Sequence, residues 1–459
     1  MGGRDHANFC MCFMHNQCVV IIMTPREAAA KIICKSVKEN AFTNIEYANI
    51  LREHEFSDGD RALLKIIING TLQNIKFIDG ILKKYIKVNY NKQKPLVKAI
   101  LQTAVFQLLF TDRIPDSAIC NEAVKITKKV VSPGISGFVN GVLRSIVRDK
   151  KELLKKKNET DLSSLPDWLV GIFTESYGKK SSDEICKAMD IPMKTAIVLN
   201  TVKFTTDEIN RMLEVDHIEI DDDNFLVTGT DLINKSSFKN GAFFIQGHSS
   251  QLIALILKPK QDEIILDCCA APGGKSFNLL VASKGKAKIH ALDISQKRVE
   301  MINDGIKRLS LDNIITEAAD ASMPLNFNEE YFDKILCDVP CTGYGSIRKK
   351  RDIIFRDMDN YKALTEIQYN ILTNTSHYLK KGGYILYSTC TLNRHENEEI
   401  VEKFVQDNRN FEFITLNEVL FERTSCIFDK KYVTILPCEK YDGFFVSLIR
   451  KKGMDKGHG

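Results

Sequence analysis

The stretch EIILDCCAAPGGKSFNLL, residues 263–280, decides the fold of the larger part of this chain. An apolar run typical of a buried strand leads directly into a loop with two glycines, and a helix-like segment follows. Glycines let a backbone approach a ligand closely, and the first turn of a helix offers unpaired N–H groups. The stretch therefore predicts a ligand-binding turn between a strand and a helix.

Three nucleotide-binding folds place such a loop at this point. A P-loop requires G-x-x-x-x-G-K-[ST]; Gly274, Lys275 and Ser276 match this pattern. However, Cys269 occupies the place of the first glycine, and Pro272 stiffens the loop. The G-x-G-x-x-G pattern of dinucleotide folds is absent. The third fold binds S-adenosylmethionine, which has no phosphate, so its loop needs only backbone proximity to the ligand.

Two acidic residues follow where strands should end. Asp293, in ALDIS, lies 19 residues after Gly274, close to the spacing of a ribose-binding acid. Asp320 ends IITEAAD, where a third strand would meet an adenine. A strand-end aspartate can also be a helix cap. Because both acids follow the glycine loop, we expect them to bind an S-adenosylmethionine cofactor.

From Gly241 onwards, short apolar runs alternate with helix-length segments. The runs are EIILDCC, AKIHALDI, YFDKILCDV and GGYILYSTC. This alternation is typical of a doubly wound, Rossmann-like α/β sheet and predicts the main domain over residues 242–451. The final segment, VTILPCEKYDGFFVSLIRKK, is expected to form two strands joined by a turn.

The first part of the chain has a different character. Residues 23–150 carry apolar residues at helical spacing and few glycines, which predicts an all-α domain. Residues 151–165 are mostly charged and polar and are expected to form a linker. Residues 166–241 combine helix-like and strand-like runs, so we expect a small α+β module there.

The composition is that of a globular protein with reduced thiols. A hydrophobic fraction of 44% excludes a disordered chain, and a net charge of +5 allows a polyanionic partner without requiring one. The 13 cysteines are scattered, which favours a reducing cytoplasm over disulfides, and no apolar run is long enough to span a membrane. We expect residues 1–22 to be a disordered leader rather than a metal site, although that segment holds four possible zinc ligands, Cys10, Cys12, His15 and Cys18.

Two cysteines stand at places that favour chemistry. Cys341, in DVPCTG, follows one apolar run, and Cys390, in STCT, ends the next, with Pro, Thr, Gly and Ser around them. The carboxyl ends of strands are where open α/β sheets keep their sites, and a thiolate is a strong nucleophile. By contrast, Cys268 and Cys337 lie within apolar runs and are expected to be core residues.

A methyl donor, two thiols and an acid suggest methylation of a pyrimidine at carbon 5. That carbon is poorly nucleophilic until a thiolate adds to carbon 6 of the ring. An acid near N3 would stabilise the developing charge, and a base must then remove the carbon 5 proton so that the thiolate can leave. One cysteine can open this cycle, and another can help to close it.

These strings resemble a known family. The motifs CAAPGGKS, DVPCTGYGSIRK, YSTCTLNRHENE, FFIQGHSSQ and YDGFFVSL closely resemble those of the RNA (cytosine-5) methyltransferases. The segments DGDRALLKIIINGTL, AVFQLLF and GFVNGVLRSI resemble the NusB-like domain of the bacterial 16S ribosomal RNA enzymes in that family. The resemblance covers roughly residues 25–450 and implies a class I S-adenosylmethionine-dependent methyltransferase.

The resemblance also implies roles for individual residues. Cys390 matches the nucleophile and Cys341 the cysteine that assists product release, while Asp338 and Lys275 are similar to residues near the target base. The implied cofactor contacts are Cys269, Ala270, Ala271, Pro272, Gly273, Gly274, Lys275, Asp293, Asp320 and Asp338. No metal is implied, and the family substrate would be cytosine 967 of 16S ribosomal RNA.

Basic runs suggest where RNA would pass. Lysines crowd residues 83–94 and 150–157, but such runs are more often a solvated surface than a binding site. The run Arg348, Lys349, Lys350 and Arg351 follows the Cys341 loop by a few residues. We therefore expect this run to overhang the site and to contact RNA phosphates. We also expect the protein to be a monomer.

The chain departs from the family pattern at four places. Gly247 stands where an acid is usual, Val339 where an alanine is usual, and Gln73 and Leu199 where arginines are frequent. These departures bear on the substrate more than on the chemistry. A tRNA-directed relative, a non-catalytic RNA-binding assembly factor and a P-loop ATPase are the alternatives.

Overall fold

The computed structural model describes residues 23–39, 42–87, 89–159, 164–191, 193–213, 217–221, 224–228, 232–355, 360–422 and 424–453. The leader expected at residues 1–22, with its four possible zinc ligands, lies outside the described residues. The chain forms two compact units. The first comprises residues 1–71 and 81–152, and the second comprises residues 72–80 and 153–459.

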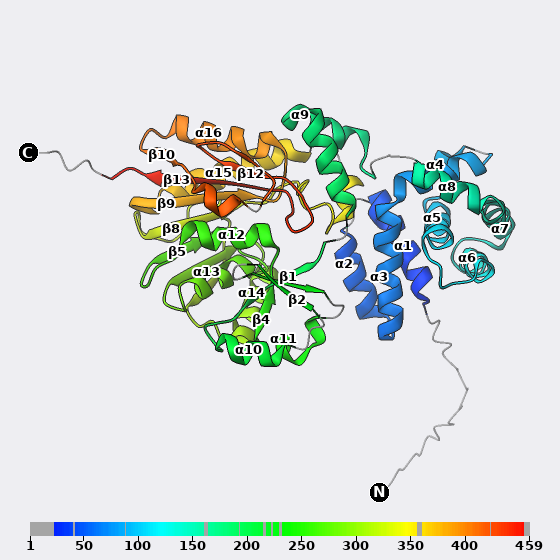
Figure 1. Ribbon diagram of the computed structural model, residues 1–459, viewed down its shortest axis with the longest axis horizontal. Helices are drawn as coiled ribbons and strands as arrows, with labels where there is room; N and C mark the ends of the chain where they lie inside the picture. Colours follow the sequence, from blue (N-terminus) through cyan, green and yellow to red (C-terminus); the bar gives the residue numbers. More distant parts are fainter. Residues whose placement is uncertain are drawn as a thin grey trace, which may run out of the picture. The chain divides into compact units, whose positions relative to one another are not determined.

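The N-terminal part is all-α, as the sequence predicted (Figure 1). At its centre, nearly every side chain of α5 from Val97 to Leu109 is buried. Gly70 of α3 permits close packing on α5, because a Cβ at this position would overlap the ring of Phe106. The helices are α1 (Pro25–Glu39), α2 (Thr43–Glu53), α3 (Asp58–Gln73), α4 (Ile75–Tyr85), α5 (Pro95–Phe110), α6 (Asp116–Val130), α7 (Pro133–Arg148) and α8 (Lys150–Glu159).

The segment expected to be a linker, residues 151–165, begins as a helix. α8 continues to Glu159, because neither glycine nor proline interrupts the chain before Pro166. The charge pattern was therefore a poor guide to backbone conformation here, since lysine and glutamate are good helix formers.

The described residues of the second unit form two sheets, of which the smaller is antiparallel with strand order β2-β3-β1-β4. Its strands are β1 (Thr195–Leu199), β2 (His217–Asp221), β3 (Asn224–Thr228) and β4 (Phe243–Ile245), and two short helices join it, α10 (Thr206–Met212) and α11 (Ser236–Lys239). The module boundary expected at residue 241 needs correction. β4 lies beyond that residue and pairs with β1, because Phe243 packs in the same buried cluster as Ile197 and Leu199.

The long helix α9 (Asp167–Asp190), kinked at Gly178, was expected to belong to the small module. Its buried side chains, including Leu169 and Phe173, instead pack in a cluster with Tyr344 and Ile347 of the larger domain. The amphipathic pattern of a helix predicts that one face is buried but not against which partner.

The larger sheet has the strand order β11-β12-β13-β9-β8-β5-β6-β7, with β10 paired to β13. Strands β7, β6, β5, β8 and β9 are parallel neighbours, and β13 is antiparallel to β9. The strands are β5 (Ile264–Asp267), β6 (Lys288–Asp293), β7 (Ile314–Ala318), β8 (Phe332–Asp338), β9 (Leu379–Thr389), β10 (Phe411–Ile414), β11 (Cys426–Phe428), β12 (Val433–Ile435) and β13 (Phe444–Lys451). The doubly wound fold predicted from the sequence is confirmed.

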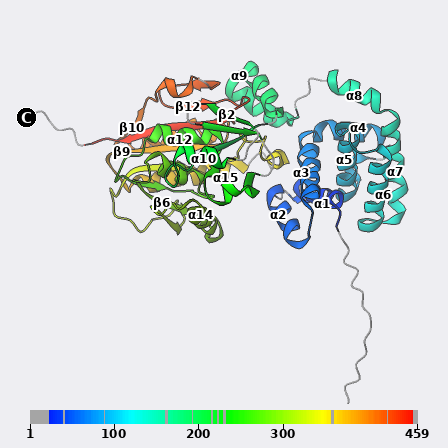
Figure 2. The ribbon, with the colours of Figure 1, turned by 60° about the horizontal axis from the view of Figure 1, so that its bottom comes forward.

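Helices cover both faces of this sheet (Figure 1). On one face α12 (His248–Leu257), α13 (Gly274–Ala282) and α14 (Gln296–Leu309) pack against strand residues such as Leu336 and Leu386. On the other face α15 (Asn360–Ser376) and α16 (Glu398–Asp407) pack against neighbours of those residues, such as Ile335 and Ile385. Figure 2 shows α14 beside β6 from a second direction. Successive strand residues thus alternate between two buried faces.

The strand order reverses between β5 and β8, because β6 and β7 lie on one side of β5 and β8 and β9 on the other. Ligands of open α/β sheets bind outside the carboxyl ends of the strands at such a switch point. Within the described part of the chain, no helix combines the length and apolarity required to cross a bilayer.

Candidate active site

Three loops meet at this edge of the sheet, one after each of β5, β8 and β9. The loop after β5 carries the two glycines, β8 ends at Asp338 and leads to Cys341, and β9 leads to Cys390. These three strands are direct neighbours, since β8 pairs with both β5 and β9. Segments far apart in the sequence are therefore brought to one place.

The glycine loop has a backbone that requires glycine. Gly273 has φ +105°, a conformation that L residues rarely adopt, and a Cβ there would overlap the ring of Phe277. α13 begins at the next residue, Gly274. The loop is also bonded to β6, because the backbone N–H of Ala271 donates a hydrogen bond to the carboxylate of Asp293, the last residue of that strand, at 3.3 Å.

The two acids expected to bind a cofactor differ in exposure. Asp293 is only 2% exposed and pairs with the guanidinium of Arg298 at 3.2 Å. Arg298 also donates to the Ala271 carbonyl, so it links the acid to the glycine loop. Asp320 is exposed and accepts two hydrogen bonds from Ser322. Arg298 was missed from the sequence; its place in the first turn of the helix after the acid was the available signal.

Lys275 and Asp338 form an ion pair at the centre of the site. Their charged atoms are 2.6 Å apart, and each side chain is about one-fifth exposed, at 21% and 20%. Burial alone would lower the pKa of Lys275, but the Asp338 carboxylate raises it, so the lysine is charged. The hydroxyl of Ser388 donates to the other oxygen of Asp338 at 2.8 Å.

A further acid, not singled out from the sequence, lies close enough to interact electrostatically with both members of this pair. Asp267, the last residue of β5, is fully buried, and the hydroxyl of Ser276 donates to it at 2.6 Å. Burial raises the pKa of Asp267 to about 7. Because Ser276 is in the first turn of α13, this hydrogen bond fixes the start of the helix that follows the glycine loop.

The sulfur atoms of Cys341 and Cys390 lie 3.4 Å apart. The hydrogen bond between the two sulfurs is the largest cause that lowers the pKa of the Cys390 thiol, to about 7, against the effect of burial. The positive charge of Lys350 and the hydroxyl of Ser346, 3.7 Å from the sulfur, act in the same direction. The pKa of Cys341 is raised by the same hydrogen bond, by burial and by nearby negative charge. Cys390 is thus the better nucleophile of the two.

The other cysteines predicted to be core residues are buried. Cys268 and Cys337 are 1% and 0% exposed. The Cys268 thiol donates to the Leu336 carbonyl at 3.1 Å, and the Cys337 sulfur lies 3.4 Å from the Thr375 hydroxyl. None of the His, Cys, Asp and Glu residues in the described ranges gather in a group of three or more that could hold a metal ion.

The basic run 348–351 has two buried and two exposed side chains. The expectation that all four residues contact RNA phosphates therefore needs correction. The side chains of Arg348 and Arg351 are only 2% and 7% exposed. Arg348 donates to the carbonyls of Cys438 and Tyr441 and pairs with Asp442. These two arginines therefore hold the loop in place, because their donors are already used within the protein.

The two lysines of the same run are exposed. Lys349 is 45% exposed and pairs with Asp442 at 2.6 Å. A Cβ at Gly247 would lie 2.6 Å from the Lys349 amine, so the lysine occupies space that an acid at position 247 would enter. Lys350 is the cation that acts on the Cys390 thiol.

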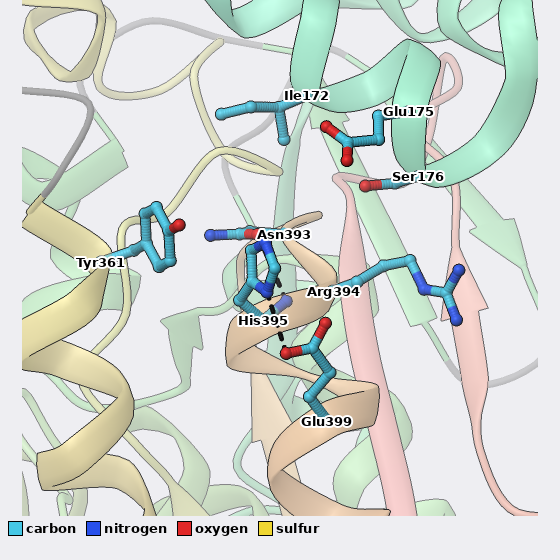
Figure 3. Close-up of a pocket in the computed structure, with 8 residues that line it drawn as sticks. All are labelled: Ile172, Glu175, Ser176, Tyr361, Asn393, Arg394, His395 and Glu399. Carbon is cyan, nitrogen blue, oxygen red and sulfur yellow. Dashed lines mark hydrogen bonds and ion pairs between the residues drawn. The ribbon is translucent and has the colours of Figure 1, made fainter.

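Beyond Cys390, the chain lines a pocket of about 390 Å³ (Figure 3). The ring of Tyr361 stacks on His395, with centroids 5.1 Å apart and planes at 9°. His395 Nδ1 lies 2.9 Å from a carboxylate oxygen of Glu399 (Figure 3). The lining residues are Ile172, Glu175, Ser176, Tyr361, Asn393, Arg394, His395 and Glu399. An aromatic surface among donors and acceptors can take a planar, polar ring.

The fold and these side chains together define a methyltransferase that uses S-adenosylmethionine. Comparison with known proteins then gives the family. The family model for 16S rRNA methyltransferase RsmB/F matches residues 254–450, and that for the NusB family matches residues 23–148. The chain therefore carries the NusB domain that its sequence resembled.

Two full-length relatives support this assignment. A probable ribosomal RNA small subunit methyltransferase B of Bacillus subtilis (strain 168) is 36% identical over 446 residues, 93% of this chain and 99% of that protein. A protein of the same name from Synechocystis is 27% identical over 94% of this chain and 100% of that protein. The chain belongs to the RsmB/F family of 16S rRNA methyltransferases.

Solved structures share the fold. The crystal structure titled PH0851 has a TM-score of 0.77 at 23% identity, covering 94% of this chain and 99% of that one. NSun6 from Pyrococcus horikoshii, solved with SFG, an analogue of S-adenosylmethionine, has a TM-score of 0.57 at 21% identity, covering 63% of this chain and 99% of that one.

The residues of this site fit S-adenosylmethionine. Beside Gly274 the loop is open, because the nearest side-chain atom to a Cβ placed there would be Gln246 Cγ, at 4.0 Å. Two large apolar residues stand beside the two acids at the sheet edge: Ile294, next to Asp293, is 69% exposed, and Met323, near Asp320, is 59% exposed. Apolar surface suits an adenine ring, and carboxylates suit ribose hydroxyls.

Proposed function

We propose that this protein transfers a methyl group to carbon 5 of a cytosine in 16S ribosomal RNA, cytosine 967, through a covalent bond between Cys390 and carbon 6 of that base. The observation that carries the proposal is the pair of sulfurs 3.4 Å apart, of which Cys390 has the lowered pKa. The curated relatives are ribosomal RNA small subunit methyltransferases B by name. The chemistry of such a pair suits addition to a pyrimidine followed by elimination.

The first step is assigned to Cys390. With a thiol pKa of about 7, a large fraction of its sulfur is thiolate at neutral pH. The thiolate adds to carbon 6, and the electron pair of the ring double bond moves toward carbon 5 and into the ring. Asp338 is assigned to N3 of the altered ring. A proton from the Lys275 ammonium, which lies 2.6 Å from the Asp338 carboxylate, can pass through that carboxylate to N3 and neutralise the negative charge of the ring. The bound S-adenosylmethionine supplies the methyl group that carbon 5 then receives.

Cys341 is assigned to the closing step. Its pKa is raised first by its hydrogen bond to Cys390, with burial and the negative charge of that sulfur adding to the effect. Once Cys390 is bonded to carbon 6, that charge is gone, so the pKa of Cys341 falls and its thiolate becomes accessible. Cys341 can then take the carbon 5 proton, the ring double bond re-forms, and the bond from carbon 6 to Cys390 breaks.

The cofactor contacts are proposed from the positions of the glycine loop and of the two acids at the sheet edge. The backbone of residues 269–275 faces the methionine part, Asp293 the ribose hydroxyls and Asp320 the adenine. Arg298 holds Asp293 against the glycine loop through its two contacts at 3.2 Å. Ile294 supplies apolar surface for the adenine, since its side chain is 69% exposed.

RNA contact is assigned to Lys349 and Lys350 of the basic run, because its two arginines are buried. The target base must leave its stack to reach Cys390. The stacked pair Tyr361 and His395 offers a surface for an unpaired base beside the target (Figure 3). The all-α domain is proposed to bind RNA as well, and the protein to act as a monomer.

One experiment tests the chemistry directly. Purified Cys341→Ala protein is incubated with S-adenosylmethionine and a 16S ribosomal RNA fragment, and the products are separated on a denaturing gel. We expect a slow-moving protein–RNA band, because the adduct forms but cannot resolve. Cys390→Ala is the matched control and should give no band. The roles are reversed if the band appears with Cys390→Ala instead.

The substrate is tested separately. Bisulfite mapping of RNA methylated by the wild-type protein should show one protected cytosine, at position 967 of 16S ribosomal RNA. A parallel reaction with tRNA tests the nearest alternative. Methylation of tRNA alone would overturn the ribosomal assignment and leave the thiol chemistry intact.

A further inference from the structure

We infer that Glu396 is a positioning residue that sets the spacing of the two thiols, by holding the loop of Cys341 against the loop of Cys390. The inference rests on the proposed roles of those thiols. Glu396 ends the short helix η4 (Arg394–Glu396), six residues after Cys390, and is completely buried. Its carboxylate touches neither sulfur and acts through the residues next to them.

The first of these residues is Thr342, which follows Cys341 in the chain. The backbone N–H of Thr342 donates to Oε1 of Glu396 at 2.8 Å, and its hydroxyl donates to Oε2 at 2.6 Å. Gln368 of α15 also donates to Oε1, at 3.1 Å, and to the Pro340 carbonyl, at 2.8 Å. The loop before and after Cys341 is thereby fixed to one carboxylate and one amide.

The second residue is Thr391, which follows Cys390. Its hydroxyl lies 3.4 Å from Oε2 of Glu396 and 2.8 Å from the hydroxyl of Thr342. The side chain of Asn393 donates to the same Oε2 at 3.1 Å. Both cysteine loops are therefore joined through a single buried carboxylate.

A carboxylate is the side chain that these partners require. All of its partners can donate, and an ionised carboxylate is an acceptor only. A glutamine at position 396 would place its NH₂ group against an N–H donor in either orientation. On one side the donors are Thr342 N and Gln368, and on the other side it is Asn393. Buried polar groups left without partners are costly, so the loops would separate.

The same carboxylate affects the second thiol. Its negative charge is one of the causes that raise the pKa of Cys341, after the hydrogen bond to Cys390 and burial. A neutral residue at position 396 should therefore lower the pKa of Cys341. Loss of overall stability alone would not produce such a shift in a folded variant.

The spacing of the thiols can be measured without RNA or cofactor. Diamide oxidises two close thiols to a disulfide and is itself reduced, so the rate at which it joins Cys341 to Cys390 reports their distance. Peptide mapping by mass spectrometry identifies the bond among the other cysteines. We expect rapid joining in the wild type, since the sulfurs are 3.4 Å apart, and joining about tenfold slower in Glu396→Gln, because disulfide formation depends steeply on geometry.

The same variant is assayed for methyl transfer. In Glu396→Gln we expect kcat to fall about 100-fold, as a misplacement of roughly 1 Å can cause, with the KM for S-adenosylmethionine within about twofold of the wild type, because the glycine loop is untouched. The matched control is Glu398→Gln. Glu398 is also buried, at 5% exposure, and its Oε2 has no hydrogen-bond partner among the described residues. Both rates should stay unchanged in this control.

The outcomes separate this inference from the proposed function. Unchanged joining and unchanged kcat in folded Glu396→Gln would overturn the positioning role. A wild type that methylates no RNA would overturn the proposed function, while the diamide rates would still test the role of Glu396. If Glu396→Gln does not fold, Thr342→Val replaces it, since that change removes only one hydroxyl donor; a wild-type joining rate in Thr342→Val would then count against the inference.

Discussion

The loop after β8 and the loop after β9 place the same reactive group at the same edge of one sheet, yet they give it opposite properties. Cys341 and Cys390 lie 3.4 Å apart, and the pKa of the first is raised while that of the second is lowered. The groups that favour the Cys390 thiolate, Ser346 and Lys350, come from the loop of Cys341. Each thiol is therefore tuned mainly by the other loop, and the comparison can be tested by changing one loop at a time.

The largest expected effect comes from the nucleophile itself. Cys390→Ala should lower methyl transfer by about 10⁴-fold or more, as removal of a nucleophile does in other enzymes that use covalent catalysis. The rate is measured by transfer of a radioactive methyl group to RNA under single-turnover conditions. Cys341→Ala should instead permit one round of adduct formation. Equal rates of the first round of reaction in Cys390→Ala and Cys341→Ala would contradict the different roles assigned to the two cysteines.

The next effect concerns Asp338, at the end of β8. Asp338→Asn removes the negative partner of Lys275 and the group proposed to act at N3 of the base, so kcat should fall about 10²- to 10⁴-fold, the range for acid–base groups. Ser388→Ala removes only one donor to the same carboxylate and should cost much less. Steady-state kinetics at saturating S-adenosylmethionine checks both. A larger loss in Ser388→Ala would place the critical group on β9.

A backbone contact between the loops gives the third test. Gly345 donates its N–H to the Cys390 carbonyl at 2.9 Å, and a Cβ at Gly345 would lie 2.8 Å from that oxygen and closer still to the Gly443 carbonyl. Gly345→Ala should therefore push the loops apart and lower kcat about 100-fold. Gly141→Ala is the control, since a Cβ there meets nothing within 4 Å. Wild-type activity in Gly345→Ala would show that the contact is not required.

The smallest effect is electrostatic. Lys350→Gln removes a positive charge that stabilises the Cys390 thiolate, so the thiol pKa should rise from about 7 and the midpoint of alkylation against pH should move upward. The shift should stay below about one unit, because salt and water screen the charge of an exposed lysine. Iodoacetamide labelling of Cys390, followed by mass spectrometry, measures it.

Lys349→Gln is the matched control for that measurement. Its amine already pairs with Asp442 at 2.6 Å, so the midpoint should not move. Both variants should weaken RNA binding, with the slope of log affinity against log salt reduced by about one in each, if each lysine contacts one phosphate. An unchanged slope in both would remove these residues from the RNA path.

The strands and their ends could be predicted well from the sequence. Apolar runs ending in Asp267, Asp293, Asp338 and Cys390 mark the sheet, because a strand buried on both faces must be apolar until it leaves the core. The environment of charged side chains was predicted poorly from the sequence. Arg348 and Arg351 look like RNA contacts in a basic run, but both are buried against backbone carbonyls of distant segments. Charge in a sequence does not say whether its partner is solvent, substrate or protein.

Local sequence determined the turn after β5, because the backbone at Gly273 has φ +105°, which strongly favours glycine. It also determined which cysteines stand at strand ends. Only the tertiary structure decided that Cys341 and Cys390 meet, that Lys275 faces Asp338, and that Glu396 joins both loops. The physical reason is the distance along the chain over which each kind of interaction acts. Glycine conformation and strand periodicity act over a few residues, whereas hydrogen bonds and charges at the site act between segments that only the strand order brings together.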